Sequence, residues 1–153
     1  MTDRPYEQPR RTAIVIAPDI ILDLINNNRG AGEAALLFDA IAADIVAGND
    51  TRPAYIASIT VPTISWLAKT SVGPVNSGAI LMDLLRLVTV APLNNADYQE
   101  ALGFTSVEYD EALQFVTCRV VGAKYLVTRN DYGMKRTPVQ RRTAGEVLPF
   151  FRK

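Results

Sequence analysis

VVGAKYLVTRND, residues 120–131, is the stretch of this sequence that decides the fold. It has the pattern of a helix end, a turn at Gly122, a short β-rich run and a polar tip, which is how a helix leads into a buried parallel strand. Ligands in open parallel sheets bind outside the carboxyl ends of the strands, so we expect a ligand-binding edge at residues 128–131. The same pattern also suits a core strand that ends in a solvated turn.

Length and composition indicate one ordinary globular domain. The chain has 153 residues, of which 48% are hydrophobic and 21% charged, which suffices for a single core. Residues 1–12 show no apolar period, so we expect a flexible N-terminal tail followed by a single domain over residues 13–153. No apolar run approaches the roughly 20 residues of a membrane helix, and the first dozen residues lack the apolar centre of a signal peptide. We therefore expect a cytoplasmic protein without membrane contact.

The inventory of reactive side chains excludes several kinds of site. The chain has one cysteine, Cys118, and no histidine. A lone cysteine cannot form an internal disulfide, and the lack of histidine excludes histidine-based triads, histidine zinc ligands and imidazole acid–base catalysis. Any chemistry must therefore use carboxylates, hydroxyls and amines.

The net charge of zero hides an asymmetry along the chain. Acidic residues outnumber basic ones between residues 13 and 118, and the sign reverses from there on. The basic residues of this last part are Arg119, Lys124, Arg129, Lys135, Arg136, Arg141, Arg142, Arg152 and Lys153. Such a split suits the binding of a polyanion, and it equally suits self-association between opposite faces.

Apolar runs alternate with helical patterns along the domain. Strands are expected at residues 13–17, 54–57, 88–90 and 125–128, with a weak edge strand at 137–140. Helices are expected after Pro18, at 33–46, after a cap at Ser58 or Thr60, at 75–87 and 95–102, from a capping box at 105–108 to Val121, and from Thr143. This alternation predicts an α/β fold, a three-layer α/β/α sandwich with a central, mainly parallel sheet in which residues 13–17 lie beside 125–128.

Four runs of the sequence together resemble the PIN-domain family. They are IAPDIILD at 16–23, ITVPTISW at 59–66, DEALQ at 110–114 and GAKYLVTRN at 122–130, and their order fits over nearly all of residues 13–153. The most specific piece is the strand end at residues 126–130. The resemblance implies an α/β/α fold, a lineage of magnesium- or manganese-dependent ribonucleases that includes VapC-like toxins, and frequent homodimers.

The resemblance also implies where a metal site would lie. The family holds divalent cations with three or four carboxylates at the carboxyl edge of the sheet, because these ions need negatively charged oxygen ligands. At the matching positions this sequence has Ala17, about Thr63, and Lys124, and only Glu111 keeps a carboxylate.

Other acids could compensate for those losses. Asp19 is either a displaced ligand or the cap of the first helix, and Asp110 and Asp131 lie within reach of the same edge. The candidate remnant catalytic acids are Asp19, Glu111 and Asp131, and a metal ion, if one binds, would use Asp19, Asp23 and Glu111.

Lys124 has two interpretations. Its ammonium either stands beside Glu111, where it would replace a metal ion and repel cations, or extends into solvent at the start of the strand. We expect no metal cofactor, with magnesium or manganese as the cofactor if the site is active.

The sequence leaves three functional hypotheses. The first is a PIN-like, nucleic-acid-binding protein with an eroded nuclease site, which would bind RNA through Thr128, Arg129, Asn130 and Lys124, with the other arginines contributing charge. The second is an active metal-dependent endoribonuclease, in which Asp19, Asp23, Glu111 and Asp131 must converge. The third is a non-catalytic dimerisation or regulatory module, a homodimer or the partner of an antitoxin-type protein, with Trp66 and the helix around Leu81–Leu85 as the candidate apolar surface.

Overall fold

One parallel sheet forms the centre of the molecule. The computed structural model describes residues 12–48, 53–131 and 137–151. Within these residues the sheet has the strand order β3-β2-β1-β4-β5, and every neighbouring pair is parallel. The strands are β1 (Ile14–Ile16), β2 (Ala54–Ile56), β3 (Thr89–Val90), β4 (Tyr125–Val127) and β5 (Gln140–Arg142).

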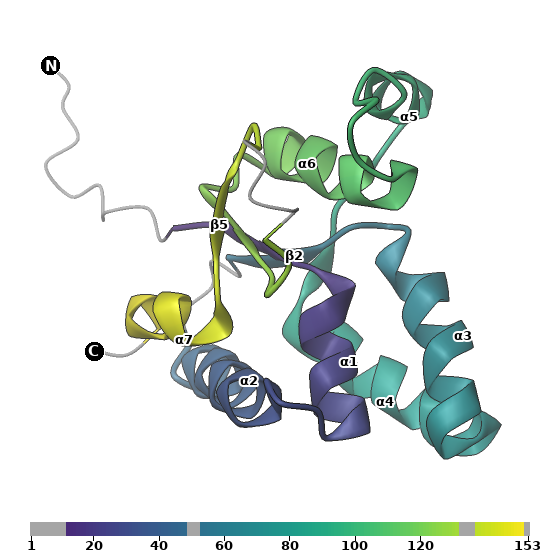
Figure 1. The fold of residues 1–153 in the computed structure, drawn as a ribbon. Helices are drawn as coiled ribbons and strands as arrows, with labels where there is room; N and C mark the ends of the chain where they lie inside the picture. Colours follow the sequence, from purple (N-terminus) through teal and green to yellow (C-terminus); the bar gives the residue numbers. More distant parts are fainter. Residues whose placement is uncertain (1–11, 49–52, 132–136, 152–153) are drawn as a thin grey trace, which may run out of the picture.

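Helices connect the strands, as parallel pairing requires. They are α1 (Pro18–Asn26), α2 (Ala31–Val46), α3 (Thr60–Val72), α4 (Pro74–Leu87), α5 (Asn95–Ala101), α6 (Tyr109–Val121) and α7 (Ala144–Val147), with a final 3-10 turn at Leu148–Phe150. In Figure 1, α5 and α6 lie on one side of the sheet, and α1, α2, α4 and α7 lie on the other. None of the described helices is both long and apolar enough to cross a bilayer.

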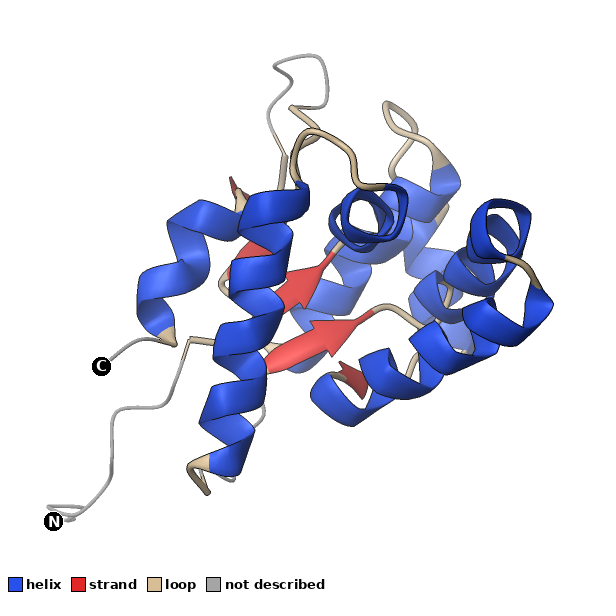
Figure 2. Ribbon diagram, turned by 90° about the horizontal axis from the view of Figure 1, so that it is seen from below, coloured by secondary structure: helices blue, strands red, loops and turns tan. Residues whose placement is uncertain are grey.

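Alternation along the strands divides the core between the two faces. Ile14 and Ile16 point into the larger apolar cluster, which α1, α2, α3 and α4 cover. Val15 and Leu126 point the other way, against Phe115 of α6. Figure 2, seen from below the view of Figure 1, shows the strands with helices of one face of the sheet in front of them. The architecture is thus a three-layer α/β/α sandwich.

The central pairing follows the prediction from sequence. Val15 of β1 lies opposite Leu126 of β4, and the Ala17 N–H donates to the carbonyl of Val127 at 3.0 Å. Pro18 begins α1 directly after this point, where its missing N–H costs nothing. The start of α1 therefore lies next to the end of β4.

Two expected elements begin elsewhere in the structure. The edge strand expected at 137–140 is wrong in position, since β5 covers Gln140–Arg142 and pairs with β4. The helix expected from 105 begins at Tyr109. Phe104 and Val107 pack against the second core cluster, which holds this segment in a turn and leaves the expected capping box unformed.

Two smaller expectations have different outcomes. The cap expected at Ser58 or Thr60 is absent, because α3 starts after Ile59 without a side-chain cap and the Ser58 hydroxyl instead contacts that of Tyr98 at 2.7 Å. The flexible tail expected at residues 1–12 lies outside the described residues, apart from Thr12.

Candidate functional site

The tip of β4 is tied to the first turn of α1. Thr128 Oγ1 lies 3.1 and 3.0 Å from the two carboxylate oxygens of Asp19, and the Arg129 N–H donates to the same carboxylate at 2.8 Å. The Asn130 N–H in turn donates to Thr128 Oγ1 at 3.0 Å. Asp19 therefore does not cap its own helix. Its carboxylate instead accepts hydrogen bonds from the residues that follow β4, which lie far from Asp19 in the sequence.

A second acid of α1 holds the Arg129 side chain. Asp23 is 2% exposed, and its carboxylate accepts two hydrogen bonds from the guanidinium, one from Nη2 at 2.6 Å and one from Nε. The hydrogen bonds to Asp23 raise the pKa of Arg129 above its ordinary value, and burial only partly opposes them. A Cβ on Gly30 would come within 2.8 Å of Arg129 Nε, so only glycine allows this close packing.

Next to the contacts between Asp19 and the residues that follow β4 lies a small cleft of about 210 Å³, which we name the acidic cleft. Its polar lining consists of Asp19, Asp110, Glu111, Gln114, Thr128 and Asn130. The acids come from the first turns of α1 and α6, where the positive end of each helix stabilises negative charge. The contact from Asn130 Nδ2 to Glu111 Oε2 is 3.4 Å, close to the limit of a hydrogen bond.

Gln114 is the site residue that the sequence analysis missed. It is 3% exposed, and its Nε2 lies 3.4 Å from Thr60 Oγ1. Its Oε1 is buried and accepts no hydrogen bond from the residues that the structure describes. The only hint in the sequence is its spacing: Gln114 follows Glu111 by three residues, so both side chains lie on the same face of α6.

The donor set does not fit the metal centre that the family resemblance implies. Divalent cations need several oxygen ligands around one point. In the described part of the chain no group of three or more acidic or cysteine side chains is close enough to hold one ion. Asp19 accepts bonds from β4 and Asp23 is paired with Arg129. The metal affinity of the protein stays a prediction for titration.

Lys124 lies away from the acidic cleft. It precedes β4, its N–H donates to the carbonyl of Ala13, and its exposed side chain places Nζ 5.4 Å from the centre of the Tyr125 ring. Thr128, at the cleft, follows four residues later, roughly 13 Å along an extended strand. The expectation that the Lys124 ammonium stands beside Glu111 is therefore wrong, and its other interpretation, a side chain in solvent, is confirmed.

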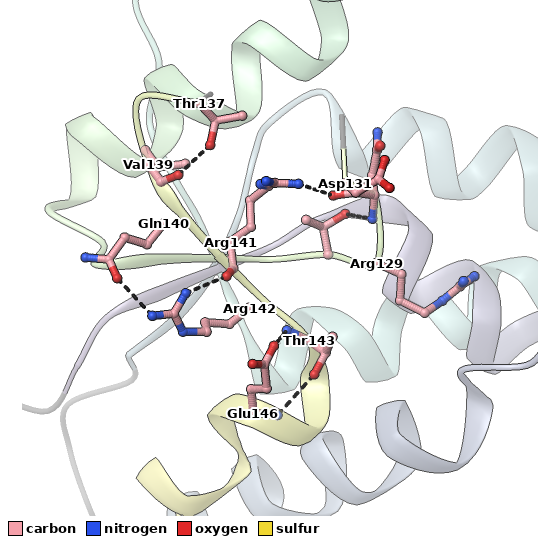
Figure 3. A pocket seen from close by; sticks show the side chains of 11 residues that line it. Arg129, Asp131, Thr137, Val139, Gln140, Arg141, Arg142, Thr143 and Glu146 are labelled. Carbon is pink, nitrogen blue, oxygen red and sulfur yellow. Dashed lines mark hydrogen bonds between the residues drawn. The ribbon is translucent and has the colours of Figure 1, made fainter. Parts of the chain in front are cut away.

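A larger cleft of about 470 Å³, which we name the arginine cleft, lies between the tip of β4 and the edge strand β5. Arg141 and Arg142 of β5 line it, together with Thr137 and Gln140 (Figure 3). Arg141 Nη1 donates to the carbonyl of Asn130 at 3.2 Å. The Arg142 guanidinium donates to the Arg141 carbonyl at 2.8 Å and to Gln140 Oε1 at 3.0 Å.

Aromatic rings support the Arg142 side chain from below. Its guanidinium carbon lies 4.7 Å from the centre of the Tyr125 ring, and that ring stacks on Phe150 with centroids 5.5 Å apart.

At the start of α7, Glu146 Oε1 accepts the Thr143 N–H at 2.8 Å and the Thr143 hydroxyl accepts the Glu146 N–H. This reciprocal cap holds the Glu146 carboxylate at the helix end.

The structure brings only some of the expected site residues together. Of the candidate acids, Asp19 and Glu111 share the acidic cleft, whereas Asp131 lines the arginine cleft. Of the predicted nucleic-acid contacts, Thr128, Arg129 and Asn130 line the arginine cleft and Lys124 does not, and the Arg129 guanidinium is bound to Asp23. The sequence analysis treated Arg141 and Arg142 only as contributors of positive charge, whereas in the structure both line the cleft.

A comparison of the sequence with protein-family models found no match, and neither did a comparison with curated proteins. The PIN-domain resemblance therefore rests on the residues quoted above and stays a prediction.

Proposed function

We propose that this protein is a PIN-like domain of ribonuclease lineage that binds single-stranded nucleic acid in the arginine cleft and has an eroded metal-dependent nuclease site. The parallel sheet supports the proposal, because ligands of such sheets bind at the carboxyl ends of the strands, where both clefts lie. The proposal includes a cytoplasmic location.

The observation that carries the proposal is the lining of the arginine cleft. Two guanidinium groups, from Arg141 and Arg142, stand there beside the hydroxyls of Thr137 and Thr143. Arginines and hydroxyls are the groups that contact phosphates in nucleic-acid complexes. Two acids, Asp131 and Glu146, also line this cleft, and the Glu146 carboxylate accepts the N–H of Thr143.

The contacts of α1 support the eroded nuclease site. Asp19 and Asp23 are the two acids of α1 at this edge, and donors from Thr128 and Arg129, which directly follow β4, bind the two carboxylates. A metal ion would have to displace these protein donors before it could use either acid. The charge of Asp23 is already balanced by Arg129, so less negative charge is left to attract a cation.

The test is a binding titration of a fluorescent single-stranded RNA across a salt series. Arg141→Gln should weaken binding several-fold and reduce the salt slope by about one counterion. Lys69→Gln is the matched control, since it removes one positive charge from an exposed site in the last turn of α3 that lines neither cleft. Equal effects of the two changes would contradict a specific role of the cleft, and no binding at low salt would refute the proposal.

An active ribonuclease is the second candidate, and the acidic cleft is the observation that favours it. Asp19, Asp110 and Glu111 line one small cavity beside Gln114. If these groups hold manganese, calorimetry should give a stoichiometric micromolar site that Glu111→Ala abolishes, together with metal-dependent RNA cleavage. That result would replace the proposal of an eroded site.

A partner-binding surface is the third candidate, and exposed apolar side chains on α3 and α4 favour it. Trp66 is 75% exposed, Val75 is 84% exposed and Met82 is 57% exposed. A homodimer or an antitoxin-type partner would cover them. Sedimentation at increasing protein concentration tests the homodimer, and a monomer at all concentrations would exclude it.

A further inference from the structure

The Arg142 guanidinium is held in one orientation at the arginine cleft. Its Nη1 donates to the Arg141 carbonyl at 2.8 Å, and its Nη2 donates to Gln140 Oε1 at 3.0 Å (Figure 3). Its carbon lies over the Tyr125 ring, 4.7 Å from the ring centre. The hydrogen bonds leave the two terminal nitrogens in the plane of the group, so the Tyr125 ring meets one face of that plane. The protein itself therefore occupies part of the edge and one face of this guanidinium.

The opposite face of the Arg142 guanidinium is turned to the arginine cleft. Arg142 is half-buried and lines the cleft, whereas Tyr125 is 8% exposed and does not line it. Seen from the cleft, the Tyr125 ring therefore lies behind the guanidinium. A planar, weakly hydrated cation that is held in place is a surface on which another flat group can stack.

The lining of the cleft favours a base beside this face. Two acids, Asp131 and Glu146, line the same cavity. Their carboxylates repel phosphates, which disfavours a course of the phosphate backbone along the whole cleft. A base carries no charge, and the cavity of about 470 Å³ lies within the roughly 300–1,000 Å³ of typical small-ligand sites. The cleft is thus large enough to take a base together with part of its sugar.

We propose that a base of the bound strand stacks on the cleft face of the Arg142 guanidinium. This inference rests on the proposed binding of single-stranded nucleic acid in the arginine cleft. In complexes with single strands, unpaired bases stack on aromatic side chains and on arginine guanidinium planes. The resulting stack runs from Phe150 through Tyr125 and Arg142 to the base. Every base has a π-face, so this contact accepts any sequence.

The test compares two strands of about eight units with equal numbers of phosphates. One is oligouridine, and the other is a chain of ribose phosphates without bases. Fluorescence anisotropy at low salt in EDTA gives both affinities without metal-dependent cleavage of the strand. Charge alone predicts equal affinities, whereas one stacked base should make oligouridine bind about 5-fold or more tighter, which corresponds to about 1 kcal/mol or more.

Two variants that keep the positive charge locate the stacked base. Arg142→Lys removes the guanidinium plane, so the ratio of the two affinities should fall towards one. Arg141→Lys is the matched control on the same strand, because the Arg141 guanidinium donates to the Asn130 carbonyl and neighbouring side chains of a strand point to opposite faces. It should change both affinities alike and keep the ratio. A merely structural effect also changes both affinities alike, since the ratio compares two strands on one variant.

Three results would overturn the inference. Equal affinity of the unsubstituted protein for both strands refutes base stacking and leaves phosphate binding in the arginine cleft intact. A preference for oligouridine that survives Arg142→Lys places the stacked base elsewhere. No binding of either strand at low salt refutes the inference together with the proposed function.

Discussion

Replacing Arg129 with methionine should destabilise the fold, because the buried carboxylate of Asp23 loses its counter-charge. Asp23 is 2% exposed, whereas the Arg129 side chain is 42% exposed. Breaking a fully buried pair costs roughly 3–5 kcal/mol. Water reaches the arginine side of this pair and screens the charge, which places the expected loss at about 2–3 kcal/mol.

Urea denaturation measures this loss directly. At an m-value of about 2 kcal/mol per molar urea, the midpoint should fall by about 1–1.5 M. The double variant Asp23→Asn with Arg129→Met should recover part of the loss, because it leaves no buried charge. Asp23→Asn alone should cost less than Arg129→Met, since the freed guanidinium can be hydrated.

Arg119→Met provides the control for this experiment. Arg119 also contacts carboxylates, Asp97 at 2.9 Å and Glu100 at 2.7 Å, but its side chain is 55% exposed and that of Glu100 is 38% exposed. The Asp97 side chain is only 12% exposed, but it keeps the Asn94 N–H as a donor when Arg119 is removed. The midpoint of Arg119→Met should therefore move far less. If Arg129→Met and Arg119→Met shift the midpoint equally, the reasoning from burial fails.

Three further changes test the packing around the site and the core. Gly30→Ala should destabilise by about 1–3 kcal/mol in urea melts, because its Cβ would displace the buried ion pair; Gly32→Ala, which has open space around its Cβ, should be neutral or stabilising. Burial raises the pKa of the Cys118 thiol from 9.0 to about 12, so on raising the pH the thiol of the unfolded chain deprotonates before that of the folded chain. The free energy of unfolding should therefore fall as the pH rises from 9.0 to about 12. Cys118→Ala should flatten the fall, and an unchanged slope would contradict the shift. Thr143→Ala, which removes the helix cap of α7, should cost about 1 kcal/mol by the same melts, whereas Thr105→Ala, in a turn that caps no helix, should cost little.

Local patterns were enough to predict the sheet and its central pairing. The runs at 13–17 and 125–127 are apolar on both faces, which is typical of a strand covered on both sides. The strand β5 was misplaced because Gln140, Arg141 and Arg142 carry no β-forming pattern, and pairing with β4 makes them a strand.

The details of the site depend on contacts that no local pattern contains. Asp19 was expected to cap a helix or to bind metal, and Asp23 to bind metal, since nothing nearby in the sequence indicates that residues 128 and 129 will bond to them. Gln114 reads as one polar position among apolar ones on α6, and only the packing of Thr60 against it shows that its amide is buried. Lys124 was expected beside Glu111 in one of its two interpretations because the family match assigns an acid to this position, although Lys124 lies at the start of its strand and the acidic cleft lies past the end of that strand.

The tether between α1 and the tip of β4 has a consequence for the order of folding. Its contacts join residues 109 and 106 positions apart, so they form only after a long loop has closed. During synthesis α1 is complete well before β4 exists, and until then Asp23 has no cation to pair with. Both clefts require the tip of β4, because Thr128 lines each of them. A nascent or truncated chain that ends before this strand carries the acids of α1 but neither cleft, so any ligand can select only the finished protein.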